Sequence, residues 1–311
     1  VGVVTTLIIE ERPYSGAVSY SYPTRDYLGF LALFLISAGG FIAVFLLTGG
    51  AAAQLKEGLR SATENRHLAG FVVEAARLGA AILSAVLIGR LTMMTGLFNR
   101  AMVREGYVEP VRDFFGRYGA GVALLLLSLV GLYRISDIVL GVISNVFYQD
   151  LGFTKVQIAG VVKTFGVIMT IAGGFVGGVL SVRFGVMRIL FLGGLLAAAT
   201  NLLFMLLARM GDSMPMLYVV ISADNLAAGL ASAAFVAFLS ALTSVRFTAV
   251  QYAVFSSLMT LVPKMLGGYS GTMVDAVGYP AFFLVTFLIG IPVLALIWVA
   301  GRRFELETPA A

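Results

Sequence analysis

The segment GAGVALLLLSLVGLYRISDIVLGVIS, residues 119–144, is apolar over a length sufficient to cross a lipid bilayer as one helix. Similar runs recur throughout the 311-residue chain, which is 59% hydrophobic and only 12% charged. A soluble domain has about 25% charged residues, and membrane-spanning strands would be short segments of alternating polarity. The sequence therefore predicts an all-α polytopic membrane protein with about eight transmembrane helices.

The expected transmembrane helices are separated by short connections that contain proline, glycine or charged residues. The helices cover residues 27–48, 69–95, 119–144, 156–181, 187–208, 216–242, 249–272 and 280–300. Lysine and arginine divide unevenly between the two sets of connections, eleven against five, and the smaller set is Lys56, Arg60, Arg66, Lys155 and Arg209. Because cytoplasmic loops carry the excess of basic residues, both ends of this chain are expected in the cytoplasm.

A basic cytoplasmic connection, residues 98–117, divides the chain into two transmembrane parts. We expect a helical hairpin over 27–97 and a six-helix unit over 118–301, which would suit one half of a two-lobed transporter. Residues 1–26 are expected to hold the end of a preceding helix and a cytoplasmic linker, and 302–311 a cytoplasmic tail. We also expect a further part of the protein upstream of Val1.

Charged residues occur inside the expected spans of the six-helix unit, where each costs about 2.5–3.5 kcal/mol on insertion scales. They are Arg134, Asp137, Lys163, Asp224 and Lys264. At about 1.5 Å per residue, all five are expected in one layer in the outer half of the membrane. This layer would be rich in cations and would suit an anionic solute, although a purely structural clasp between helices is an open alternative.

Chain geometry indicates one pairing within this layer. Asp137 and Lys163 are equidistant from the turn at position 150, so they would meet in an antiparallel hairpin if their faces agree. Arg134 precedes Asp137 by three residues and can share its carboxylate. Burial favours the neutral form of a carboxyl group and a nearby cation favours the ionised form, so Asp137 and Asp224 are the candidate proton carriers.

A polar stripe continues along the same helix, because residues at spacings of three and four share a face. Asn145 and Tyr148 extend it, while Asn225 lies in the sixth span and Gln251 and Tyr252 lie near the inner end of the seventh. These side chains could bond to a polar solute. Asn and Gln in spans also serve as hydrogen-bond links between helices, and for Gln251 the two interpretations remain open.

Small residues indicate close helix packing or movement. The fourth span holds two overlapping pairs, Gly173/Gly177 and Gly174/Gly178, which let a neighbouring backbone approach closely. Pro263 frees a backbone carbonyl in the seventh span beside Lys264, which would suit either a gate or a fixed bend. The loop around Arg183 is similar to the cytoplasmic-loop signature of the major facilitator superfamily, but Val182 replaces its usual acid.

Four segments of the six-helix unit together carry a family resemblance. They are YRISD (133–137), the Asp-Asn pair at 224–225, GLASAAFVAFLSAL (229–242) and FTAVQYAVFSS (247–257). In combination they resemble the carboxyl half of AmpG-type permeases, which form part of the peptide/acetyl-coenzyme A/drug transporter family within the major facilitator superfamily. The resemblance covers about 118–300, and the hairpin at 27–97 resembles two additional helices of bacterial members.

The resemblance implies a bacterial inner-membrane permease that imports anhydro-muropeptides for peptidoglycan recycling by proton symport, together with an amino-terminal lobe. Proton coupling would then fall to Asp137 and Asp224. Substrate binding would fall to Arg134, Lys163, Lys264, Asn145, Tyr148, Asn225, Gln251 and Tyr252. The expected gating residues are Gly173, Gly177, Pro263 and Arg183.

Two other functions stay open. The first is a permease of the same superfamily for acetyl-coenzyme A, a drug or another organic anion, and the second is a non-transporting membrane sensor or scaffold. An enzyme is not expected, because no set of nucleophile, base and orienting group is evident. With no cysteine and His67 as the single histidine, neither a metal site nor a cofactor is expected, and the net charge of +5 requires no nucleic acid.

Overall fold

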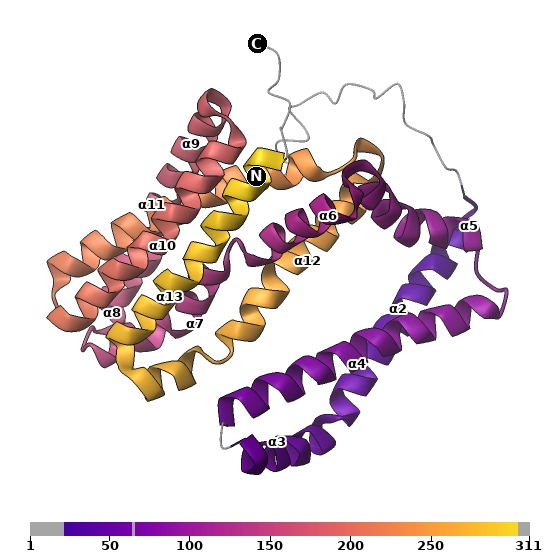
Figure 1. The fold of residues 1–311 in the computed structure, drawn as a ribbon, viewed down its shortest axis with the longest axis horizontal. Helices are drawn as coiled ribbons and strands as arrows, with labels where there is room; N and C mark the ends of the chain where they lie inside the picture. The colour runs from indigo at the N-terminus through magenta and orange to yellow at the C-terminus, as the bar shows by residue number, and fades with distance from the viewer. Residues whose placement is uncertain (1–21, 64–65, 304–311) are drawn as a thin grey trace.

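The computed structural model describes residues 22–63 and 66–303. Within these ranges the chain forms helices and no strand (Figure 1). Eight helical segments in this part are long and apolar enough to cross a membrane, so the predicted all-α polytopic membrane fold is confirmed. The helix end expected before residue 22 and most of the expected tail lie outside the described residues.

The amino-terminal part is a hairpin of α2 (Thr24–Leu47) and α4 (Arg66–Met94), joined by the shorter helix α3 (Gly49–Thr63). The two long helices pack against each other, and Gly40 makes room for Ile88, whose Cδ1 would lie 2.2 Å from an added Cβ. The segment between the first two spans was predicted as a loop, but most of it is helical. His67, expected in that loop, lies in the first turn of α4.

The connection between the hairpin and the remaining helices is also helical. It contains α5 (Arg100–Val103), the π-helical segment η1 (Arg104–Val108) and the first turns of α6 (Glu109–Leu132). Gly119 interrupts α6 with φ 71° and ψ 158°, a conformation that glycine adopts without steric cost. The expected third span begins at this residue.

The remaining helices form the larger part of the molecule. They are α7 (Ile135–Asp150), α8 (Lys155–Ile158), η2 (Ala159–Phe165), α9 (Gly166–Phe184), α10 (Val186–Met210), α11 (Met214–Leu242), η3 (Val245–Phe247), α12 (Thr248–Gly267) and α13 (Ser270–Arg303). The strongest packing joins α9 to α11 and α10 to both α11 and α13, while α12 packs on α6 and α7. Buried aromatic rings of Phe147, Phe204 and Phe283 hold α7, α10 and α13 together.

Two expected spans differ from the helices in the structure. The third was expected to be continuous to residue 144, but the chain leaves the helix after Leu132, resumes it at Ile135 and continues to Asp150. The seventh was expected to reach 272 with an interruption at Pro263. Instead α12 runs through Pro263 and ends at Gly267. The eighth span follows Gly278, where φ is 76° and ψ is 165°, close to its expected start.

Candidate functional site

The candidate site is built around the break between α6 and α7. Arg134 stands at the N-cap position of α7 with φ −95° and ψ 13°, and Asp137 lies in the first turn of that helix. A helix N-terminus favours a carboxylate at this position. The guanidinium of Arg134 is 3.4 Å from the carboxylate of Asp137, and the two side chains are 25% and 17% exposed. The break thus brings two opposite charges together between long apolar segments.

Arg134 also connects this pair to α11. Its Nη1 donates a hydrogen bond of 2.6 Å to the hydroxyl of Ser232. The Ser232 hydroxyl itself donates a hydrogen bond of 2.6 Å to the carbonyl of Ala228, one helical turn earlier in α11. The guanidinium is therefore held between a carboxylate of α7 and a hydroxyl of α11.

Asp224 is the second carboxylate of the site. It accepts a hydrogen bond of 3.2 Å from Thr200 on α10. Asp224 also lies close enough to Asp137, Arg134 and Tyr148 to interact with them electrostatically. Together, Arg134, Asp137 and Asp224 form what we call the charge cluster, with one cation and two carboxyl groups. With both carboxyl groups ionised the cluster carries a charge of −1, so it differs from the cation-rich layer that the sequence predicted.

The two lysines of the predicted layer do not join the charge cluster. Lys163 and Lys264 are exposed, and neither forms an ion pair within the part of the chain that the structure describes. The pairing of Asp137 with Lys163 was therefore wrong. Lys163 lies in η2, where the wider π-helical turn changes the rotation on which the antiparallel register depended. Moreover, η2 packs on α11, while α7 packs on α10, α12 and α13.

Two predicted substrate-binding amides bind other parts of the protein instead. Asn225 accepts a hydrogen bond of 2.9 Å from Thr170, which links α9 to α11. Its nitrogen donates one of 3.0 Å to the carbonyl of Ile221 within α11. Gln251 is only 3% exposed. Its nitrogen donates to the Pro110 carbonyl at 2.8 Å and to Asp113 at 3.1 Å. Both amides match the alternative of a link between helices.

The predicted polar stripe on α7 is not uniform. Asn145 is exposed, whereas Tyr148 is 2% exposed and its ring packs against Phe147 and Phe204. Tyr252 is half-buried and packs against the apolar core. Residues at helical spacing share a face, but the neighbouring helices cover only part of that face.

The expected gating residues lie on α9 and α12, whereas the members of the charge cluster belong to α7 with its N-cap and to α11. Gly173 and Gly177 are buried in the contact of α9 with α11, where added Cβ atoms would lie 2.2 Å from the Leu226 carbonyl and 2.7 Å from Leu230 Cα. Arg183 is exposed at the end of α9, with its guanidinium 5.4 Å from the centre of the Phe184 ring. Pro263 is buried inside α12.

Sequence reasoning missed the hydroxyl groups of the site. Ser232 and Thr200 each bind a member of the charge cluster, and neither stands out because serine and threonine are common in membrane helices. A second buried network was also missed: Asn201 donates to Ser136 at 2.6 Å, and Ser136 donates to the Thr286 carbonyl at 2.8 Å. This network fixes α7 against α10 and α13 directly beside the helix break.

Searches for related proteins connect this arrangement to named transporters. No family model matches the chain. AmpG 4 of Rickettsia conorii is 31% identical over 199 residues, which is 64% of this chain and 47% of that protein. AmpG 4 of Rickettsia felis is 27% identical over 270 residues, or 86% of this chain and 64% of the relative.

A third relative has a name that specifies its cargo. The anhydromuropeptide permease of Escherichia coli K12 is 31% identical over 204 residues, which is 65% of this chain and 41% of the permease. The chain thus spans between about two fifths and two thirds of the length of these curated relatives. These matches confirm the resemblance that the sequence indicated: the chain is similar in sequence to proteins named AmpG and to an anhydromuropeptide permease.

Proposed function

We propose that this protein works in the bacterial inner membrane as a secondary transporter that imports anhydro-muropeptides by proton symport. The observation that carries the proposal is the charge cluster at a helix break, in a chain related to AmpG-type permeases. Broken helices and buried ionisable groups are typical of binding and coupling sites in transporters. In the same proposal, residues 118–301 form one transporter lobe, 27–97 are an inserted hairpin, and both chain ends face the cytoplasm.

We assign the proton to Asp224 and a supporting role to Asp137. Arg134 lies beside Asp137 and favours its ionised form, whereas the bonded partner of Asp224 is the neutral hydroxyl of Thr200. Protonation of Asp224 would cancel the net negative charge of the cluster. Arg134 binds both Asp137 and Ser232. A change in the net charge of the cluster would therefore alter the link that Arg134 makes between the start of α7 and α11.

The exposed polar side chains are the better candidates for contact with cargo. Lys163, Lys264 and Asn145 are exposed, while Asn225 and Gln251 already bond to protein groups. The exposed ammonium groups of Lys163 and Lys264 would suit the carboxylates of a peptide stem. They would equally suit another organic anion, such as acetyl-coenzyme A, which is the second candidate. Competition between labelled anhydro-muropeptide and these anions separates the two candidates.

Uptake measurements with Asp224→Asn test the proposal. We expect cells that make the unmodified protein to accumulate labelled anhydro-muropeptide, and a protonophore to abolish this accumulation. The Asn variant should lose accumulation but still exchange labelled for unlabelled cargo across the membrane, because exchange needs no net proton movement. Asp212→Asn, in the exposed loop after α10, is the matched control and should behave as the unmodified protein.

Two results would contradict this proposal. Gradient-dependent accumulation at the unmodified rate in the Asp224→Asn variant would remove Asp224 from proton coupling. If the variant is present in the membrane yet neither accumulates nor exchanges cargo, the charge cluster is a structural clasp, as in a sensor or scaffold. Membrane abundance is measured for each variant, so that loss of folding is not mistaken for loss of coupling.

A further inference from the structure

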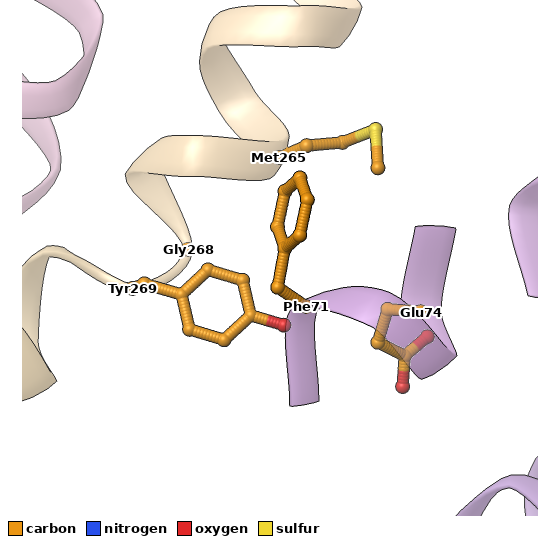
Figure 2. Close-up of a pocket in the computed structure, with 5 residues that line it drawn as sticks. All are labelled: Phe71, Glu74, Met265, Gly268 and Tyr269. Atoms are coloured by element: carbon orange, nitrogen blue, oxygen red, sulfur yellow. The ribbon is translucent and has the colours of Figure 1, made fainter. Parts of the chain in front are cut away.

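A pocket of about 300 Å³ lies where the hairpin meets the larger helical part (Figure 2). Phe71 and Glu74 of α4 form one wall, and Met265, Gly268 and Tyr269 at the end of α12 form the other. The rings of Phe71 and Tyr269 contact each other edge to face, with their centres 5.9 Å apart. The volume is at the lower end of pockets that bind small molecules, about 300–1,000 Å³.

The pocket lies near the membrane surface, because both of its walls are close to helix ends. Phe71 and Glu74 are five and eight residues from the start of α4, about 7–12 Å at 1.5 Å per residue. Met265 is two residues from the end of α12. Val72 and Leu261 beside the walls are 44% and 40% exposed, so apolar side chains on both helices face the surroundings. If α4 and α12 cross the membrane as their length and hydropathy indicate, the surroundings at this depth are the boundary between lipid head groups and acyl chains.

The polar end of the pocket belongs to an ion-pair network with one excess positive charge. Glu74 pairs with Lys56 of α3 at 2.5 Å and with Arg77 at 3.3 Å. Arg77 also donates to the backbone carbonyl of Phe45, and its guanidinium lies 4.0 Å from the centre of the Phe45 ring. Arg77 is therefore held against α2 and is 16% exposed, whereas Lys56 is 38% exposed. The accessible part of the excess charge is the ammonium group of Lys56.

We propose that the pocket holds the upper part of one acyl chain of an anionic phospholipid, whose phosphate pairs with Lys56. Phe71, Met265 and Tyr269 supply an apolar wall for the chain, and the net positive charge beside Glu74 selects a lipid with a net negative head group. A lipid in this position contacts α4 and α12 at once. It therefore joins the hairpin to the larger helical part where the two meet at Phe71 and Tyr269.

Native mass spectrometry of the purified protein with added phosphatidylglycerol or phosphatidylethanolamine tests this proposal. We expect more bound phosphatidylglycerol than phosphatidylethanolamine, and a smaller preference at raised salt concentration. Lys56→Gln should lower phosphatidylglycerol binding about fivefold, the effect of one basic residue beside an anionic lipid. The control is Lys155→Gln, an exposed lysine at the start of α8, which should leave binding unchanged.

A second variant fills the pocket without touching the ion pairs. Gly268 has φ −57° and ψ −18°, which any residue adopts, and an added Cβ would meet nothing closer than 3.4 Å. Gly268→Leu should lower the binding of both lipids. The control is Gly79→Leu, which adds the same side chain to an open surface of α4.

Three results would overturn the lipid site. The first is equal binding of the two lipids by the unmodified protein, and the second is a preference that salt does not reduce. The third is binding by the Gly268→Leu variant that equals that of the Gly79→Leu control. The salt measurement needs no variant, so the proposal stays testable even if Lys56→Gln disturbs folding. None of these measurements depends on transport activity.

Discussion

At the scale of single residues, the buried side-chain amide of Gln251 forms hydrogen bonds to protein groups through both its nitrogen and its oxygen. Its nitrogen donates to Pro110 and Asp113, while its oxygen accepts from the backbone N–H of Ser244 at 2.7 Å and from Arg117 at 3.1 Å. Arg117 in turn donates to the Leu242 carbonyl at 3.1 Å. Gln251 therefore ties the start of α6 to the turn between α11 and α12.

We expect Gln251→Leu to destabilise the protein by about 1–3 kcal/mol, because it leaves buried polar partners without a hydrogen bond. Thermal unfolding in detergent, followed by circular dichroism, measures the loss as a lower midpoint. Gln149→Leu is the matched control, since Gln149 is exposed and donates only to the Asn145 carbonyl one turn back. Equal midpoints for the two variants would show that the Gln251 hydrogen bonds contribute nothing to stability.

Residue types and spacing predicted the three members of the charge cluster and the pairing of Arg134 with Asp137, but not the other partners. An arginine and two aspartates in apolar spans were visible because each is costly in a membrane. The partner of each depends on how its helix is rotated. Asp137 has the predicted partner Arg134 but not the predicted partner Lys163, and Asp224 has Thr200, which resembles any other threonine in the sequence.

At the scale of helices, sequence predicted the spans well because length and hydropathy determine them. The expected third span starts at Gly119 and the expected eighth starts at Pro280, two residues after Gly278, and both glycines have the positive φ that favours glycine. The break at Tyr133–Arg134 and the π-helical segment η2 were not predicted. A break of two residues changes neither the length nor the average hydropathy of a span, so pattern reasoning passes over it.

The structure distinguishes two glycine pairs of α9 that look equivalent in the sequence. Gly173 and Gly177 lie in the contact with α11, whereas Gly174 and Gly178 have more space around them. An added Cβ at Gly177 would lie 2.7 Å from the backbone of Leu230, whereas one at Gly178 would meet nothing within 4 Å. We therefore expect Gly177→Ala to destabilise the protein by about 1–3 kcal/mol through overpacking.

The neighbouring variant Gly178→Ala is the control for this contact. It should be neutral or slightly stabilising, since alanine is the better helix former by about 1 kcal/mol. The yield of folded protein and its unfolding midpoint in detergent compare the two variants. A lower midpoint for Gly178→Ala than for Gly177→Ala would contradict the packing described for α9 and α11.

At the scale of the whole molecule, the polar side chains form separate networks within a mostly apolar chain. The charge cluster lies at the break between α6 and α7, the Gln251 contacts hold the start of α6, and the Lys56 network lies at the turn of the hairpin. In the proposed topology the last two lie on opposite sides of the membrane.

The proposed topology gives an expectation for every connection between spans. Basic residues in the connections divide eleven to five between the two sides, and the proposed topology places the side with more of them in the cytoplasm. Because the sequence has no cysteine, a single cysteine introduced at an exposed position reports the side on which that position lies. We expect Asp212→Cys and Lys155→Cys to react with a membrane-impermeant maleimide added to intact spheroplasts.

The opposite behaviour is expected on the basic side. Arg183→Cys, at the exposed end of α9, should react only after the membrane is permeabilised, because the proposed topology places this end of α9 on the cytoplasmic side. The cysteine-free parent protein gives the background. Reaction of Arg183→Cys in intact spheroplasts, with protection of Asp212→Cys, would invert the topology. That inversion would move the Lys56 network and its lipid to the cytoplasmic leaflet, while the contacts within the charge cluster would stay as they are.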